Sequence, residues 1–387
     1  MPAGPLIAGL DRVPLRISPW AWLGLPILVE QHFPPALPEN PWDTLLPLPP
    51  MPQLIELEIA LGPGDYNSLH RLFHERQPRL RSVHLNGTLS TSWGNEFDYK
   101  ALTNLHIAPR TSPQVIAHVI SKCHSLQRLF IEQGASSEIS RATSVYPDPS
   151  MPDITLDRIN LGNLLQLRVQ GDVACVVASA ITAPGLISLE VFGASTNYDE
   201  TGTMPPRYFL QLLRDSRHAH PALQYLSLAY VECSFPGHEP MVASELAMFL
   251  AGHEALEVLM LARDVLLPHL IAQVCGLASA QGRKIYRNWR LLHLLTSDDM
   301  RLFCRTLPDF KPLLVGNKML NIEFGDQTRN DEWGEDEIAL SRALAPRVQC
   351  VESKWCYDDF ASYWVGSRIG DWAWDRPMKY LEEARQL

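Results

Sequence analysis

One motif, Leu-x-x-Leu-x-Leu with Ile or Val also allowed, recurs along this chain and limits the folds that the chain can adopt. Eight copies begin at residues 54, 80, 102, 126, 164, 186, 223 and 256. Intervals of 22, 24 and 26 residues are too short for an ordinary βαβ unit, which takes about 30 or more. Intervals of 33, 37 and 38 residues indicate insertions. A degenerate ninth copy begins at Trp289, and weaker candidates lie at Leu320–Ile322 and Val348–Val351.

Segments with helical periodicity lie between the copies of the motif. The clearest begins with Ser112 in the cap position and Pro113 in the first turn, and its apolar residues share one face. Similar segments start at Asp65 and Ser297. In a solenoid of such strand–helix units, each repeat's leucines are covered only by the neighbouring repeats. We therefore predict an α/β, leucine-rich-repeat-like solenoid (horseshoe), with parallel strands on the concave face and helices on the convex face.

Prolines and insertions set the expected boundaries. Thirteen of the 31 prolines fall within 1–52, which we interpret as a Pro-rich N-terminal segment and partial cap. The irregular solenoid is expected to occupy 53–350, with loops near 133–158, 193–206 and 326–337. Residues 351–387 are expected to form an aromatic-rich C-terminal cap and tail. On this interpretation the 387 residues form one extended domain.

Aromatic residues concentrate in the expected C-terminal cap. Because a solenoid exposes a leucine-lined end, we interpret these rings as covering that end. An exposed aromatic docking patch is the alternative. The rings belong to Trp355, Tyr357, Phe360, Tyr363, Trp364, Trp372 and Trp374.

The strand geometry predicts a functional surface. Side chains alternate along a strand, so the residues that flank the motif's second leucine are expected to point to the concave face. Aromatic residues and arginine dominate interface energetics, so exposed Phe130 and Tyr225 would be anchors, and exposed Arg128 and Arg168 specific charges. A partner-binding face follows, with a merely solvated face as the alternative. Its expected residues are Glu58, His84, His106, Arg128, Phe130, Arg168, Glu190 and Tyr225.

The sequence offers little that points to catalysis or metal binding. His84 and His106 occupy equivalent positions of adjacent predicted strands, where a metal-binding or pH-sensing pair is one interpretation. Without a third ligand, we interpret them as two solvent-exposed imidazoles. The motifs G-x-S-x-G, G-x-x-x-x-G-K-S/T and G-x-G-x-x-G are absent from the sequence. We therefore expect no enzyme, no cofactor and no metal site.

Composition narrows the class of partner and the compartment. The formal charge of −10 argues against nucleic acid or anionic lipid as the main partner. The seven cysteines are scattered and include no C-x-x-C pair, which is typical of reduced thiols in a cytoplasmic or nuclear protein. The apolar stretch 20–29 is too short to span a membrane and contains Pro26. A protein partner is therefore the expectation.

Two features of the sequence resemble the repeat region of fungal F-box/leucine-rich-repeat proteins. The first is the loose Leu-x-x-Leu-x-Ile strand motif preceded by proline, as in Met51-Pro52-Gln53-Leu54, and the second is the upstream segment 10–17. The resemblance covers about 10–350. In that family an N-terminal F-box binds an adaptor of a cullin ubiquitin ligase, and the repeats hold the substrate. The F-box itself is not evident here: segment 25–33 is similar to its first helix, but prolines at 34, 35, 38 and 41 would end that helix.

The leading hypothesis is a non-catalytic protein-binding module that resembles the substrate-recognition part of an F-box ubiquitin-ligase receptor, divergent or truncated at the F-box. The resemblance implies a cullin-ligase adaptor as a second partner. An adaptor or scaffold unrelated to ubiquitin is the alternative, and an α/β enzyme without a recognisable motif is a third.

Overall fold

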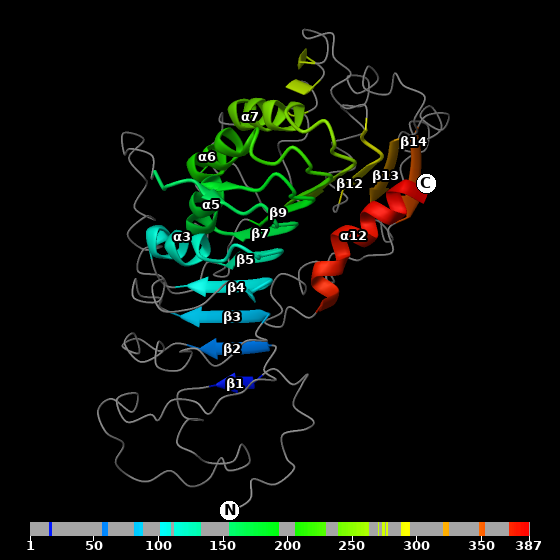
Figure 1. Cartoon of the computed structure of the whole chain (residues 1–387). Helices are drawn as coiled ribbons and strands as arrows, with labels where there is room; N and C mark the ends of the chain where they lie inside the picture. Colours follow the sequence, from blue (N-terminus) through cyan, green and yellow to red (C-terminus); the bar gives the residue numbers. More distant parts are fainter. Residues whose placement is uncertain are drawn as a thin grey trace, which may run out of the picture.

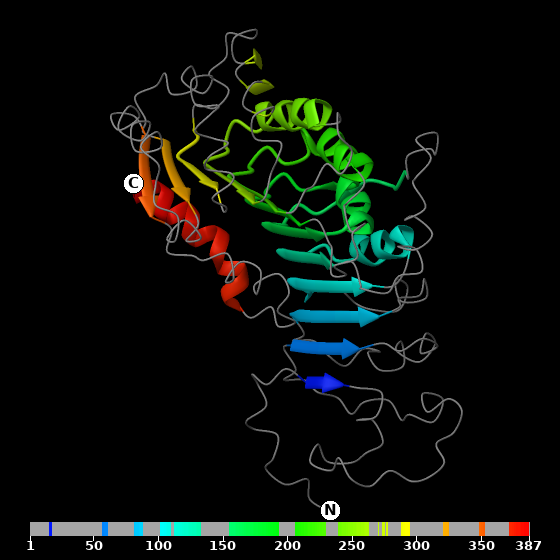
Figure 2. The ribbon, with the colours of Figure 1, turned by 180° about the vertical axis from the view of Figure 1, so that it is seen from behind.

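The chain folds into an open, parallel sheet with helices packed against it, an α/β arrangement (Figure 1). The computed structural model describes residues 15–17, 56–60, 81–87, 101–109, 112–132, 155–192, 206–229, 239–262, 270, 273–274, 276–277, 288–294, 320–324, 348–352 and 371–386. Figures 1 and 2 show the strands stacked in chain order in a sheet that bends, with helix α12 on the inside of the bend.

Twelve strands of the described residues form the main sheet, in the order β1-β2-β3-β4-β5-β7-β9-β10-β11-β12-β13-β14. Each pairs with its neighbour in parallel, so β1 and β14 are the two edges. The first six are β1 (Leu15–Ile17), β2 (Glu56–Ala60), β3 (Ser82–Gly87), β4 (Asn104–Pro109), β5 (Arg128–Glu132) and β7 (Gln166–Gln170). The others are β9 (Ser188–Phe192), β10 (Tyr225–Ala229), β11 (Val258–Ala262), β12 (Leu291–Leu294), β13 (Leu320–Phe324) and β14 (Val348–Glu352).

The helices lie on both sides of this sheet. Four of them, α3, α5, α6 and α7, line one side, and α12 lies on the other (Figures 1 and 2). Their bounds are α3 (Pro113–Ser121), α5 (Asp172–Ser179), α6 (Pro206–Ser216), α7 (Glu239–Ala251) and α12 (Asp371–Gln386). A short second pair, β6 (Ile159–Asn160) with β8 (Ile181–Thr182), was not expected from the sequence.

Five of the repeats enter their strands through the same hydrogen-bonded turn. The backbone N–H of the motif's first leucine donates to the carbonyl three residues earlier, as in Leu126 to Cys123, Leu186 to Ala183 and Leu256 to His253. The first residue of each following strand then donates to the preceding repeat, as in Arg128 to Thr103. These bonds satisfy backbone groups that would otherwise be buried without partners.

The core lies between the sheet and the four helices. The motif leucines point into it, because Leu105, Leu129 and Leu167 are buried together with Ile116 and Val119 of α3. The N-terminus of α3 is where the sequence predicted it, with Pro113 in the first turn, although the Ser112 side chain makes no capping hydrogen bond. The helices expected after Asp65 and Ser297, and the loops expected at 133–158, 193–206 and 326–337, lie largely or entirely outside the described residues.

Two asparagines link neighbouring repeats at the same position of the motif. Asn163, just before Leu164, donates its side-chain N–H to the His124 carbonyl at 3.1 Å, and Asn288, just before Trp289, donates to the Glu254 carbonyl at 2.7 Å. The role of these two asparagines was not expected from the sequence.

The weakest copies of the motif also form strands, with one difference in register. Leu292 of β12 aligns with Leu259, and Ile322 of β13 aligns with Leu292, so these strands continue the sheet. In β14 Cys350, not Val351, aligns with Ile322, so the expected spacing was wrong by one residue there. No helix in the described part of the chain combines the length and apolarity needed to cross a membrane.

Candidate functional site

The face of the sheet opposite α3, α5, α6 and α7 is called the inner face here, and it carries the predicted site. Its central row consists of residues that align across successive strands in register. The row contains Glu58, His84, His106, Phe130, Arg168, Glu190, Ser227 and Met260. The parallel row two residues earlier contains Glu56, Ser82, Asn104, Arg128, Gln166, Ser188, Tyr225 and Val258.

The inner face changes from accessible to buried along the sheet. Ser82, His84, Asn104, His106 and Arg128 are half-buried, so β3, β4 and the start of β5 retain solvent contact. From Phe130 onward, the described side chains in both rows are buried. Of the predicted binding residues, His84, His106 and Arg128 therefore remain accessible, whereas Phe130, Arg168, Glu190 and Tyr225 are covered. The Glu58 side chain lies outside the described part.

Three rings stack along the accessible end. His84 and His106 have ring centroids 3.9 Å apart, and His106 and Phe130 have centroids 4.4 Å apart. Stacking in parallel strands follows from the shared register, which places equivalent side chains about one strand spacing apart. The two imidazoles are therefore half-buried rather than fully solvent-exposed as expected, because each ring shields its neighbour.

His106 also contacts Glu132, two residues past Phe130 on the neighbouring strand. Nε2 and Oε2 lie 2.9 Å apart, and because a carboxylate oxygen only accepts, Nε2 donates its hydrogen. Burial, together with the positive charge of Arg168, lowers the pKa of His106 to about 3. Burial raises the pKa of Glu132. The His106 imidazole is therefore neutral at neutral pH, and its contact with Glu132 is a hydrogen bond rather than an ion pair.

A buried ion pair lies at the centre of the inner face. Arg168 Nε donates to Glu190 Oε1 at 3.0 Å and Nη2 donates to Oε2 at 3.3 Å. The two side chains are only 3% and 2% exposed. The prediction that Arg168 would be an exposed partner-binding charge was therefore wrong. The adjacent strands β7 and β9 place Arg168 and Glu190 directly opposite one another.

Phe130 and Tyr225 are buried as well, which overturns their expected exposure. Phe130 is 4% and Tyr225 1% exposed. The Tyr225 hydroxyl donates to Met260 Sδ at 3.7 Å, and its ring lies 6.2 Å from that of Tyr380 in α12. Burial raises the pKa of Tyr225. These contacts give the inner face a small apolar cluster of its own, separate from the main core.

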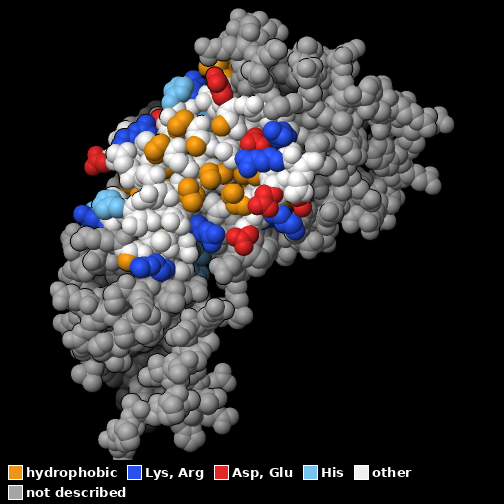
Figure 3. Space-filling model, turned by 45° about the vertical axis from the view of Figure 1, so that its right-hand side comes forward, with side chains coloured by type: hydrophobic (Ala, Val, Ile, Leu, Met, Phe, Trp, Pro, Cys, Tyr) orange, Lys and Arg blue, Asp and Glu red, His pale blue; other side chains and the backbone are white. Residues whose placement is uncertain are grey.

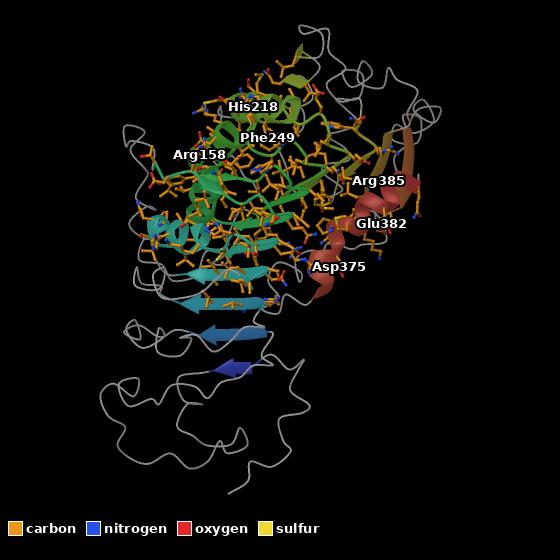
Figure 4. The ribbon with its side chains drawn as sticks, viewed as in Figure 1. Arg158, His218, Phe249, Asp375, Glu382 and Arg385 are labelled. Atoms are coloured by element: carbon orange, nitrogen blue, oxygen red, sulfur yellow. The ribbon has the colours of Figure 1, made fainter. Side chains whose placement is uncertain are left out.

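Helix α12 is the element that covers this part of the inner face. At one end Asp375 lies 3.5 Å from Arg128 of β5. At the other end Arg385 donates to Glu257 at 2.9 and 3.1 Å and to Gln224 at 2.9 Å. Figure 4 shows Asp375, Glu382 and Arg385 spaced along the helix. On the side of the molecule shown in Figure 3, acidic and basic side chains lie next to one another beside a group of apolar ones.

The position of α12 on the inner face was not expected from the sequence. Its C-terminal aromatic residues were expected to cap the end of the repeats, and those at 355–364 lie outside the described residues. The available signal is the spacing of Pro377, Tyr380, Leu381 and Ala384, which places apolar residues on one face of a helix. That pattern predicts a helix lying on a surface, but it does not identify the surface.

Within the described part of the chain, no three His, Cys, Asp or Glu side chains gather closely enough to hold a metal ion. No protein-family model matches this chain, and no curated protein matches it in sequence.

Proposed function

We propose that the chain is an irregular leucine-rich-repeat-like solenoid that binds a protein partner along its inner face and performs no catalysis. The observation that carries this proposal is the register of the inner face: charged, polar and aromatic side chains stand in continuous rows across the parallel strands. The turn that recurs before five of the strands and the bonds to the preceding repeat support the solenoid.

The accessible end of the inner face is the proposed contact surface. His84, Asn104, His106 and Arg128 are half-buried and lie on three neighbouring strands. Their stacked rings are already ordered, so binding costs little side-chain entropy. Arg128 adds a charge whose side chain is 31% exposed, which allows it to pair with a carboxylate of a partner. Glu58 extends the same row by one strand.

A comparison of two amide-to-arginine variants tests this surface. Asn104→Arg places a long charged side chain in the middle of the accessible end, whereas Gln114→Arg makes the same change at an exposed position of α3 on the other side of the sheet. Both proteins are purified with their partners from the native cell and the partners are quantified by mass spectrometry. We expect partners that Asn104→Arg loses and that Gln114→Arg retains.

Thermal unfolding of both variants is the control for folding. If every partner of the wild type binds both variants equally while both remain folded, the inner face is not the binding surface. A substrate that is converted when the purified protein is incubated with cell extract metabolites would instead favour the enzyme hypothesis.

The ubiquitin-ligase role is the specific form of the proposal. It rests on the resemblance to F-box/leucine-rich-repeat proteins, in which the repeats hold the substrate. Recovery of a cullin-ligase adaptor that is lost when residues 1–50 are deleted would support this role. Partners recovered without any adaptor would favour the alternative, an adaptor or scaffold unrelated to ubiquitin.

A further inference from the structure

Helix α12 has the build of a bound helical peptide. Its buried apolar residues Pro377, Tyr380, Leu381 and Ala384 follow the spacing i, i+3, i+4, i+7 and form a single stripe. The buried Arg376 lies beside this stripe, 5.6 Å from the centre of the Tyr380 ring, whereas Glu382 on the other side of the helix is exposed. A helix that lays one apolar stripe on a preformed surface is a common mode of peptide recognition.

The helix crosses several repeats rather than packing within one. Asp375 lies against β5, Tyr380 against β10 and Arg385 against the start of β11, so the helix advances as the strands advance. Ten residues of helix span about 15 Å. Four strand spacings span about 19 Å, a similar distance. The inner face therefore accommodates a helix of two to three turns aligned with the stack of strands.

The contacts that hold α12 are of a kind that can be exchanged. Its two ends are held by ion pairs whose α12 partners, Asp375 and Arg385, are 69% and 44% exposed. Such exposed pairs contribute little and are weakened by salt. Pro377 stands inside the helix, where a proline lacks the N–H that the helix needs and disfavours helical structure in the free segment. The helix therefore depends on its docking surface.

We propose that α12 is an internal competitor for the partner, and that the partner's binding element is an amphipathic helix that displaces it. This proposal rests on the proposed function of the inner face. Residues 353–370 connect α12 to the rest of the chain, which raises the effective concentration of the helix at the inner face. Weak contacts are therefore sufficient to keep α12 bound there. A partner binds when its own helix fits better or when α12 is released.

The charges on the inner face define the helix that would fit. Arg128 near β5 favours a carboxylate at the helix N-terminal end, and Glu257 near β11 favours an arginine or lysine at the C-terminal end. Tyr225 and Met260 between them favour an aromatic residue followed by a small apolar one, as in Tyr380 and Ala384. The predicted partner helix thus carries an acid, an aromatic residue and a base at about the spacing of α12.

A fluorescein-labelled peptide with the sequence of residues 371–387 is the probe. It is titrated in trans against the full-length wild type and against the variant Asp375→Arg with Arg385→Glu, which reverses both end charges of the internal helix. The peptide keeps the native charges and matches Arg128 and Glu257. We expect fluorescence anisotropy to report binding at least about tenfold tighter for the variant than for the wild type.

Two controls make the result specific. Asp215→Arg with Lys122→Glu changes the same number of charges at exposed positions on the helical side of the sheet, and it should bind the peptide as the wild type does. A labelled peptide carrying Tyr380→Asp should bind none of the proteins. Equal binding of the native peptide to the charge-reversed variant, the wild type and the control, with all three folded, would overturn the proposal.

Hydrogen exchange of the wild type tests the proposal even if the charge-reversed variant fails to fold. A displaceable α12 should exchange its amide hydrogens at least about 100-fold faster than Leu189 and Val191 of β9. Protection of α12 equal to that of β9 would mean that the helix is a fixed part of the core. Either negative result leaves the Asn104→Arg experiment unaffected, so failure of the competitor model and failure of the binding face are distinguishable.

Discussion

At the scale of single residues, the buried pair of Arg168 and Glu190 departs most from what the sequence suggested. A charged residue in a strand position that faces away from the leucines is normally exposed. Here both charges are removed from water, which is costly, and each depends on the other for compensation. Burial lowers the pKa of Arg168, and Glu190 beside it opposes that shift. The two residues therefore act as a unit in stability.

Replacing one member of this pair should lower the free energy of unfolding more than replacing both members. We expect Glu190→Gln to lower the free energy of unfolding by about 3–5 kcal/mol, because Arg168 is then left as a buried charge without a counter-ion. Arg168→Met with Glu190→Leu should lower it by less than the single variant does, since neither charge of the pair then remains buried. Urea unfolding followed by circular dichroism measures both. A double variant as unstable as the single one would show that the pair is not the reason for the loss.

Two buried histidines, His220 and His253, occupy the turn that precedes the strand in successive repeats. Their Nδ1 atoms lie 3.3 Å from the Ala183 carbonyl and 2.7 Å from the Phe249 carbonyl, so each ring donates there. Burial lowers the pKa of His220 to about 4 despite the favourable bond to Ala183, and burial also lowers the pKa of His253. His220 is therefore neutral in the folded protein well below pH 6, and protonation of His253 is also disfavoured by folding.

Stability should consequently fall in mild acid. In the unfolded chain His220 titrates near pH 6.5, so between about pH 6.5 and 4 the unfolded state binds a proton that the folded state excludes. His220 should then lower the free energy of unfolding by up to about 1.4 kcal/mol per pH unit, and the lowered pKa of His253 acts in the same direction. His220→Asn should flatten the profile of melting temperature against pH, whereas His218→Asn at an exposed position (Figure 4) should not. Identical slopes for the two variants would exclude His220 as a cause.

At the scale of elements, the strands could be predicted and α12 could not. The motif specifies which strand residues are buried by leucine packing, and a shift of one residue would expose every leucine, so register is strongly determined from β3 to β11. In β14 two apolar residues, Cys350 and Val351, stand next to one another, and the register expected from Val348 and Val351 differed by one position. The position of α12 on the sheet depends on contacts between residues more than 100 positions apart in the sequence, which no local pattern encodes.

Leu→Ala substitutions at a buried and at an exposed leucine distinguish the core from the surface. Leu105→Ala in β4 should lower the free energy of unfolding by about 2–5 kcal/mol, because the side chain is buried among the motif leucines. Leu165→Ala, just before β7, should change it by less than about 0.5 kcal/mol, because that side chain is exposed. Chemical denaturation measures the two side by side. A loss below about 1 kcal/mol at Leu105 would count against the repeat assignment in β4.

At the scale of the whole molecule, the recurring sequence motif was sufficient to predict a parallel sheet with its strands in chain order. The accessible part of the candidate site, His84, His106 and Arg128, could be located from the alternation of side chains. The burial of Arg168, Glu190 and Tyr225 could not, because it results from an element that folds back over the sheet. A repeat array transmits contacts only between neighbours, whereas α12 ties β5 to β11 directly.

This bracing role predicts how unfolding changes when α12 is removed. Ending the chain after residue 370 should expose Tyr225, Val258 and Met260 and leave the repeats connected only through their neighbours. Tryptophan fluorescence and circular dichroism, which coincide for a two-state transition, should then report separate urea transitions. The slope of unfolding free energy against urea should fall by about a tenth, because less surface is buried. The outer-surface variant Gln114→Ala should keep coincident transitions, and coincidence in the truncated chain as well would mean that α12 does not couple the repeats.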